Sequence, residues 1–293
     1  MAIIFDGYKM AKDIELQLTA EVAQLKKQGV NLCIASVLFT EDSGSVLYTQ
    51  LKKEAAGRIG IDYQVQSFSL KTDVNQVIKH LHQLNTDQTV TGIIIQKPWR
   101  QTWQQITTGS AQDFQVWWQT LTQAINPAKD VDGLHPETMM AIKNHTWRQE
   151  KKVLPATCRA VLDIMTQALD HQELQTKKVV ILGKSDLLGQ PLFYELKNRG
   201  CEVEMIGSAE LTERVNGGVG LRDADIIVSA TGRRHLITGE MIKTGAIVID
   251  VGEPQPDVDF ASVSPKAAFI TPVPGGVGPM TVISLMKNCV QLI

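Results

Sequence analysis

The sequence predicts an α/β protein with two domains, an N-terminal three-layer α/β domain and a Rossmann-like domain built on a parallel sheet. The chain has 293 residues, 43% of them hydrophobic, which suffices for two domain cores. In both halves, short apolar runs typical of buried strands alternate with longer segments of helical periodicity. Such alternation indicates βαβ units, in which helices cover both faces of a parallel sheet.

Two glycines mark the ends of the first two helices. Gly29 and Gly60 each follow a segment of helical periodicity, and glycine often terminates a helix. The apolar runs NLCIASVLF and TGIIIQ predict buried strands. In this half we expect a helix over 7–28, a strand over 31–39, a helix over 45–59 and a strand over 91–96.

The second half repeats the pattern after Pro155. We expect helices over 155–169 and 191–198, and strands over 179–183, 203–207, 224–232 and 246–252. The polar stretch NHTWRQEKK separates the two halves. We therefore expect a first domain over 1–146 and a second over 147–270, with residues 271–293, including the C-terminal helix, returning to the first domain.

Charge and cysteine content exclude several classes of protein. Lys and Arg number 29 against 31 Asp and Glu, a formal net charge of −2, so there is no basic field for nucleic acid. The four cysteines show no C-x-x-C spacing, which argues against zinc and disulfides and fits a reducing cytoplasm. No run is long enough to span a membrane, and the N-terminus, which contains Asp6, does not resemble a signal peptide. We expect a cytoplasmic protein without a metal.

The motif KVVILGKSDLLGQP has the character of an anion-binding turn. Gly183 directly follows an apolar strand and Gly189 begins a helix, whose N-terminal N–H groups and dipole attract a pyrophosphate. Because the spacing differs from G-x-G-x-x-G, this turn alone is equally compatible with a plain βα connection. The motif SATG, with Thr231 and Gly232, ends a later strand of the same unit, and the two motifs together favour a dinucleotide.

Three residues favour NADP over NAD. Lys184 and Ser185 stand in the glycine turn, and Ser208 ends the next strand, where an acidic residue would bind the ribose 2′-hydroxyl of NAD. A lysine and two hydroxyls instead suit a 2′-phosphate. Glu210, two residues further on, is the feature that would favour NAD, so NAD stays open as the alternative.

One helix carries candidate catalytic side chains. Ser45, Tyr48 and Lys52 are spaced so that a hydroxyl, a phenol and an ammonium share one face. The same spacing also occurs on ordinary solvated helices. Short-chain dehydrogenases use Tyr and Lys at this spacing as well, but there the pair follows the nucleotide turn, whereas here it precedes Gly183.

Polar residues also follow the strands of the first half. Gln96 ends a strand, and Asp130 and Asp132 lie in the Gly/Pro-bounded loop INPAKDVDGLHPE. An amide and carboxylates in such loops can read the donors and acceptors of a heterocycle. The D-x-D-G pattern is also compatible with a turn; the further ligands of a calcium loop do not follow, and His135 is interpreted as a turn residue.

The loop TPVPGGVGPMT combines rigidity with an open surface. Prolines fix φ, while glycines permit positive φ and close approach to the backbone, so the loop can hold a flat ligand. The alternative is a simple linker into the C-terminal helix.

Taken together, these motifs resemble the methylenetetrahydrofolate dehydrogenase/cyclohydrolases of one-carbon metabolism, which feeds purine biosynthesis. They span almost the whole chain, and PGGVGPMT is highly specific. The resemblance implies a homodimer that oxidises 5,10-methylenetetrahydrofolate with NADP and hydrolyses the product to 10-formyltetrahydrofolate. It also implies the roles of the residues. Lys52 is the central catalytic group, Gln96 orients it and Tyr48 positions the substrate, Asp132 holds the pterin ring, and the folate is contacted by Ser45, Pro272, Gly275 and Gly276.

The sequence departs from the family pattern at several positions. QKPWR stands where Q-L-P-L-P is usual, PATCRA where P-C-T-P-x-G is usual, Lys184 where arginine is usual, and DVGE, ending at Glu253, where D-V-G-I-N is usual. These changes leave two rivals: a dehydrogenase without the hydrolytic step, and a silent paralogue that binds folate or nucleotide. A shikimate-dehydrogenase-like enzyme would not explain PGGVGPMT. Residues 101–123, rich in Gln, Thr and Trp, are interpreted as an inserted surface segment close to the folate site.

Overall fold

The computed structural model describes residues 2–170 and 173–293, which form two compact units. The first unit contains the chain up to Lys12 together with Pro155–Ser284, and the second contains Asp13–Leu154 with Leu285–Ile293. This division differs from the predicted bounds at both ends of the chain. The first residues belong with the nucleotide half because strand β1 (Ile3–Ile4) pairs with β9 (Phe269–Ile270), and the return to the other unit falls inside the last helix.

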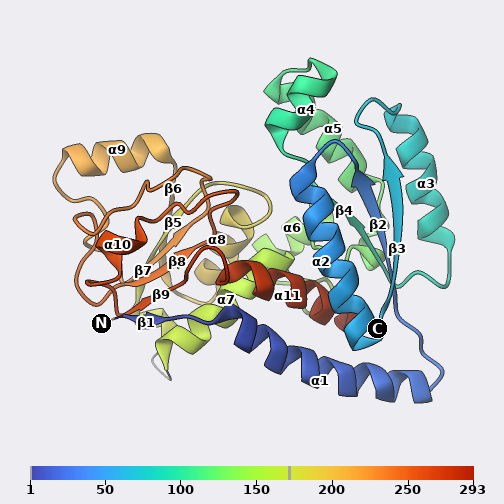
Figure 1. Cartoon of the computed structure of the whole chain (residues 1–293), viewed down its shortest axis with the longest axis horizontal. Coiled ribbons are helices and arrows are strands. Elements are labelled where there is room, and N and C mark those ends of the chain that lie inside the picture. Colours follow the sequence, from blue (N-terminus) through green and yellow to red (C-terminus); the bar gives the residue numbers. More distant parts are fainter. Residues whose placement is uncertain (1, 171–172) are drawn as a thin grey trace. The chain divides into compact units, whose positions relative to one another are not determined.

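The first unit is built on a six-stranded parallel sheet with the order β1-β9-β8-β7-β5-β6 (Figure 1). Strands β6 and β7 lie on opposite sides of β5, so the direction of winding reverses at β5. In open α/β sheets, ligands bind at the carboxyl ends of the strands at such a reversal. The other strands are β5 (Lys178–Leu182), β6 (Glu202–Ile206), β7 (Ile226–Ser229) and β8 (Ile247–Asp250).

Short helices connect these strands. Prediction placed helix α8 over 191–198, and it begins two residues earlier, at Gly189. Helix α9 was not predicted, because SAELTERVN carries too few apolar residues to give a clear pattern. The helices of this unit are α7 (Ala156–Leu169), η2 (Leu174–Thr176), α8 (Gly189–Asn198), α9 (Ser208–Asn216) and α10 (Phe260–Val263).

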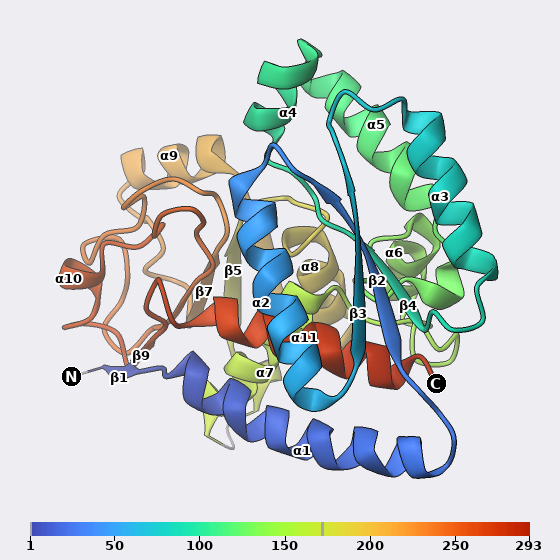
Figure 2. The same cartoon turned by 45° about the vertical axis from the view of Figure 1, so that its right-hand side comes forward.

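The second unit has a three-stranded parallel sheet with the order β3-β2-β4. Figures 1 and 2 show α2 on one face of this sheet and α3 with α5 on the other, which gives the predicted three layers. The strands are β2 (Cys33–Phe39), β3 (Asp62–Phe68) and β4 (Gly92–Ile95). The helices are α2 (Ser43–Ile59), α3 (Val74–Thr86), α4 (Arg100–Thr107), α5 (Ala111–Gln123), η1 (Pro127–Lys129) and α6 (Pro136–Lys143).

Two long helices run from one unit into the other along the chain. They are α1 (Gly7–Lys27) and α11 (Val277–Gln291). In the second unit, the Asn288 amide on α11 donates to the carbonyl oxygens of Val131 and Leu154 at 3.0 and 2.8 Å. These buried bonds hold the end of the chain in the unit that also contains the Asp130–Asp132 loop.

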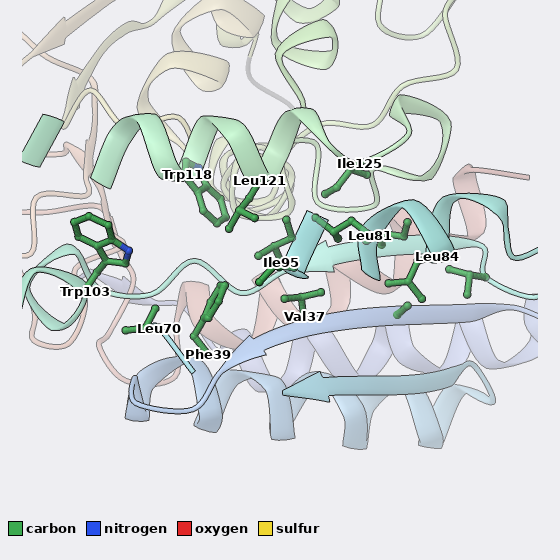
Figure 3. Packing of buried hydrophobic residues seen from close by; sticks show 14 of the residues in the cluster. Val37, Phe39, Leu70, Leu81, Leu84, Ile95, Trp103, Trp118, Leu121 and Ile125 are labelled. Atoms are coloured by element: carbon green, nitrogen blue, oxygen red, sulfur yellow. The ribbon is translucent and has the colours of Figure 1, made fainter. Parts of the chain in front are cut away.

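Residues 101–123 are part of the core rather than a surface segment. Trp103 on α4 and Phe114 and Trp118 on α5 are buried, and Trp117 packs with its ring centroid 5.0 Å from that of Phe39 on β2. Figure 3 shows Trp118 and Leu121 pointing from α5 toward the sheet. The expectation of an inserted surface segment is therefore corrected, because its aromatic side chains cover one face of the sheet.

Candidate functional site

A buried lysine and a buried glutamine meet in the second unit. Lys52 on α2 is 8% exposed and Gln96, directly after β4, is 4% exposed. The Lys52 side-chain nitrogen donates to Gln96 Oε1 at 2.8 Å. The pairing brings together two residues that stand 44 positions apart in the sequence, and it agrees with the expected grouping of these side chains.

The amide of Gln96 is itself held in one orientation. Its Nε2 lies 3.3 Å from the Ser36 hydroxyl and 3.5 Å from the Tyr63 hydroxyl. Burial raises the pKa of Tyr63, and the negative charge of Asp132 adds to this, so the phenol stays neutral. With its NH₂ group facing these hydroxyls, Gln96 must present its oxygen to Lys52. Prediction missed Ser36 and Tyr63, since each lies inside a strand without a local motif.

The N-terminus of α2 is fixed to the loop after β4. Asp42 caps the helix by accepting the Ser45 N–H at 2.9 Å, and its other oxygen accepts the Trp99 N–H at 3.2 Å. The Ser45 hydroxyl donates to the Lys97 carbonyl at 3.3 Å. Ser45 and Lys52 are buried on one face of α2, and Tyr48 on the same helix is half-buried. The QKPWR segment therefore leaves Gln96 in register with the helix that carries Lys52.

The two aspartates of the KDVDG loop have different surroundings. Asp130 is buried and accepts the N–H groups of Leu134 and His135 at 3.1 and 2.8 Å and the Thr138 hydroxyl at 2.9 Å. Burial raises the pKa of Asp130, which these donors oppose. Asp130 thus fixes the conformation of the loop and is not a ligand-binding residue. Asp132, in contrast, is half-buried. His135 caps α6 by accepting the Glu137 N–H, as expected of a turn residue.

In the first unit, the glycine turn after β5 requires two of its glycines. Gly183 has φ +112°, and a Cβ there would lie 2.5 Å from the Ala230 carbonyl oxygen. A Cβ on Gly189 would lie 2.0 Å from the carbonyl oxygen of Gly183. The Ser185 hydroxyl accepts the Leu188 N–H at 3.3 Å and so closes the turn. The result is a bare backbone leading into the N-terminus of α8, which fits the pyrophosphate of a dinucleotide.

The SATG loop is held by a carboxylate that prediction missed. Asp257 is completely buried, and its Oδ2 accepts the Ser229 hydroxyl at 2.7 Å and the N–H and hydroxyl of Thr231 at 2.6 and 2.9 Å. Its Oδ1 accepts the Arg233 N–H at 2.8 Å. Asp257 therefore fixes the loop that carries Thr231 and Gly232. In the sequence, Asp257 is marked only as an acidic residue after Gln-Pro, and this pattern is too common to indicate a functional role.

A second buried carboxylate, Asp250 at the end of β8, shapes the segment that carries Asp257. It accepts the N–H groups of Gly252, Asp257 and Val258 at 2.8, 3.2 and 3.0 Å. Burial raises the pKa of Asp250 to about 6. Asp250 also faces a cavity of about 230 Å³ lined by His235, Asp250, Pro256, Val258, Phe260, Thr271, Pro272 and Val273.

The Pro/Gly loop packs closely against the start of α1. The Gly7 N–H donates to the Gly275 carbonyl at 3.0 Å, and a Cβ on Gly7 would lie 1.9 Å from the Gly276 carbonyl oxygen. Gly275 has φ +99° and approaches the ring of Tyr8. Close packing within this unit therefore explains part of the glycine content, beside any contact with a ligand.

Lys184 in the glycine turn pairs with Glu210 on α9. The other carboxylate oxygen of Glu210 accepts the Gly207 N–H at 3.1 Å. Ser208 begins α9 next to this bond. Of the cluster expected around a 2′-phosphate, Lys184 is thus engaged by an acid, and Ser185 bonds within its own turn.

The described part of the chain has neither a helix suited to a membrane nor a cluster suited to a metal ion. Within residues 2–170 and 173–293, no helix has the length and apolarity needed to cross a membrane. Among these same residues, no group of His, Cys, Asp or Glu side chains is arranged to hold a metal ion.

Comparison with known proteins gives a consistent result. Residues 5–132 match the tetrahydrofolate dehydrogenase/cyclohydrolase catalytic domain, and residues 155–293 match the NAD(P)-binding domain of the same family. The bifunctional protein FolD of Staphylococcus aureus is 33% identical over 98% of this chain and 95% of its own. Among solved structures, FolD of Campylobacter jejuni has 30% identity and a TM-score of 0.85, covering 100% of this chain and 98% of its own. The Trypanosoma brucei enzyme complexed with NADP cofactor and inhibitor has 30% identity and a TM-score of 0.86, covering 99% and 97%.

Proposed function

Because the chain belongs to the tetrahydrofolate dehydrogenase/cyclohydrolase family, we propose that it oxidises 5,10-methylenetetrahydrofolate with NADP and hydrolyses the methenyl product to 10-formyltetrahydrofolate. The enzyme is an oxidoreductase and hydrolase of folate one-carbon metabolism with an NAD(P)-binding domain. The buried hydrogen bond from Lys52 to Gln96 is the main support for the residue roles in this proposal.

The oxidation asks the protein for positioning rather than for acid or base catalysis. When bound, NADP supplies the nicotinamide that accepts hydride from the bridging carbon of the substrate. The cation left on the folate is delocalised over two nitrogens, so no proton has to be removed. In this proposal the turn with Gly183 and Gly189 binds the pyrophosphate, the loop with Thr231 and Gly232 orients the cofactor, and Asp132 holds the pterin ring. Ser45, Pro272, Gly275 and Gly276 are assigned to folate contacts.

The hydrolysis needs a group that can order a water molecule or take its proton. Lys52 is proposed for this role, because its nitrogen is held at one position by the Gln96 oxygen and its surroundings exclude bulk water. Gln96 is proposed as the residue that orients Lys52, and Tyr48 as a residue that positions the substrate. The fixed amide of Gln96 supports retention of the hydrolytic step in spite of the QKPWR change, and so disfavours a dehydrogenase-only enzyme.

The test is turnover with NADP and NAD in parallel, with separate detection of the methenyl and formyl products. Lys52→Met keeps the apolar stem and removes the nitrogen, so hydrolysis should fall by about 10²–10⁴-fold, the range for a lost acid–base group, while oxidation survives in part. Methenyltetrahydrofolate should then accumulate. Lys53→Met is the matched control, since Lys53 is the next residue on α2 and is exposed.

The alternative outcomes are distinct. If Lys52→Met lowers both activities equally while the protein stays folded, Lys52 positions the substrate for both steps. If neither activity falls, the assignment of Lys52 is wrong. If the unmodified protein turns over neither substrate but binds folate or nucleotide, the silent-paralogue reading replaces the proposed activity.

We also infer a homodimer, as the family resemblance implies, and a cytoplasmic location. All four cysteines are buried as free thiols, and burial raises the pKa of each of them, which fits a reducing compartment. Light scattering on the purified protein measures its mass in solution, and a monomer mass at micromolar concentration would contradict the dimer.

A further inference from the structure

Glu210 stands where a Rossmann domain receives the ribose of its cofactor. It lies on the first turn of α9, just after β6, the strand that follows the glycine turn. An acidic residue at this place commonly binds the ribose 2′-hydroxyl of NAD, whereas a cation there accepts the 2′-phosphate of NADP. This chain has both kinds of residue, and they are paired with each other.

The carboxylate of Glu210 engages the two groups that would otherwise bind a phosphate. One oxygen accepts from the Lys184 ammonium, and the other accepts the Gly207 N–H at the N-terminus of α9. An ammonium and a helix N-terminal N–H are the donors that a 2′-phosphate requires. A phosphate must therefore displace the carboxylate or bind beside it.

The pair is accessible to a ligand, and its acid is ionised at neutral pH. The side chains of Lys184 and Glu210 are 49% and 45% exposed. The bond from Lys184 lowers the pKa of Glu210, which keeps the acid ionised. The cation that α9 itself carries, Arg214, bonds Glu204 of the edge strand β6 at 2.8 Å and Asp223 at 2.5 Å, so it is engaged away from Glu210.

We propose that Glu210 determines the cofactor preference of this enzyme by weakening the binding of NADP relative to NAD. It competes with the 2′-phosphate for Lys184 and repels the phosphate charge, and it offers an acceptor to the 2′-hydroxyl of NAD. The inference rests on the proposed function only in requiring that the domain bind a nicotinamide dinucleotide.

The test measures binding of two fragments that differ in the 2′-phosphate. Adenosine 2′,5′-bisphosphate and 5′-AMP are titrated calorimetrically into the full-length protein without folate. Glu210→Gln removes the charge, and its amide oxygen still accepts the Gly207 N–H, so the helix start is kept. We expect the bisphosphate to bind roughly 2- to 5-fold more tightly, the scale of one charge contact at an exposed site, and AMP to bind equally or more weakly. In turnover, KM for NADP should fall and KM for NAD should rise.

Two further variants separate this effect from a change in net charge. Glu213→Gln removes one negative charge from the same helix at an exposed position without disturbing Lys184. The double variant Lys184→Ala with Glu210→Gln should lose most of the gain, because the gain comes from the released ammonium.

The proposal is overturned if Glu210→Gln leaves the preference unchanged, if Glu213→Gln has the same effect, or if AMP and the bisphosphate tighten equally. Hydrolysis of methenyltetrahydrofolate, assayed without nucleotide, tests the proposed function separately. Absence of that activity in the unmodified protein would overturn the proposed hydrolysis, while the binding data would still decide the role of Glu210.

Discussion

Replacement of Asp257 by asparagine should weaken cofactor binding while sparing hydrolysis. The hydrogen bonds of the Asp257 carboxylate go to Ser229, Thr231 and Arg233, which hold the SATG loop and are not assigned to the folate chemistry. Asparagine has the same shape and can keep only one of the two acceptor oxygens. The other position becomes an NH₂ group that faces a donor.

The magnitude follows from the four bonds. If the asparagine oxygen takes the Oδ2 position, the contacts to Ser229 and Thr231 remain as weaker neutral bonds, and the Arg233 N–H at 2.8 Å faces a second donor. One lost bond to a charged acceptor is worth about 1.5–3 kcal/mol. If the lost free energy shifts the equilibrium of the loop toward an open conformation and the unit stays folded, the cofactor should bind about 10- to 100-fold more weakly.

The assay compares NADP affinity, oxidation and nucleotide-free hydrolysis on the same preparation. Asp259→Asn is the matched control, because Asp259 precedes α10 and makes no side-chain capping bond. We expect weaker NADP binding and a raised KM for NADP in Asp257→Asn, with hydrolysis close to that of the control. Unchanged NADP affinity, or hydrolysis that falls in step with oxidation, would refute a role for Asp257 in positioning this loop.

Three other changes test separate parts of the chain. Lys184→Ala should raise KM for NADP far more than KM for NAD, and equal effects would remove Lys184 from the phosphate site. Because burial raises the pKa of Asp250 from 3.8 to about 6, with the charge of Asp257 adding to the effect, the folded state holds this proton more tightly than the unfolded state. Its contribution to the unfolding free energy should therefore fall by about 2 kcal/mol as pH rises from 4 to 6. Asp250→Asn should lose that part of the slope in urea unfolding, and an unchanged slope would contradict it. Trp103→Ala should lower the unfolding free energy by about 3–5 kcal/mol, whereas Trp99→Ala, at a side chain 36% exposed, should cost less. Similar losses would mean that α4 is not part of the core.

The alternation of strands and helices was readable because buried strands of a parallel sheet are continuous apolar runs. All seven residues of β2 and all four of β4 are buried, and both strands were predicted. Strand β3 was missed because it is an edge strand whose residues are mostly exposed, so DYQVQSF lacks an apolar run. The division into units depends on the pairing of β1 with β9, which joins segments more than 260 residues apart and leaves no local pattern.

The same contrast applies to the site. Lys52 and Gln96 were each singled out by position, one on a helix face and the other at a strand end, whereas their pairing was implied by the family resemblance. Asp257 had no sequence signature, because its partners are set by the order of β7 and β8 in the sheet.

The D-V-D-G motif shows what separates a structural aspartate from a ligand-binding one. Asp130 and Asp132 are the same residue type two positions apart, so the local pattern gives each an equal claim and only the family resemblance singles out Asp132. Asp130 forms an isolated β-bridge with Ile93 of β4, and its carboxylate accepts hydrogen bonds from three donors of the loop and α6. A carboxylate whose acceptor positions are occupied by donors of the protein has few left to accept hydrogen bonds from a ligand. Asp132 is half-buried and close enough to Tyr63 to raise that phenol's pKa, which places its charge near the cluster around Gln96. Replacement by asparagine should therefore separate the two, with Asp130→Asn lowering stability and Asp132→Asn raising KM for folate at nearly unchanged stability. Comparable losses of stability in both would contradict the distinction.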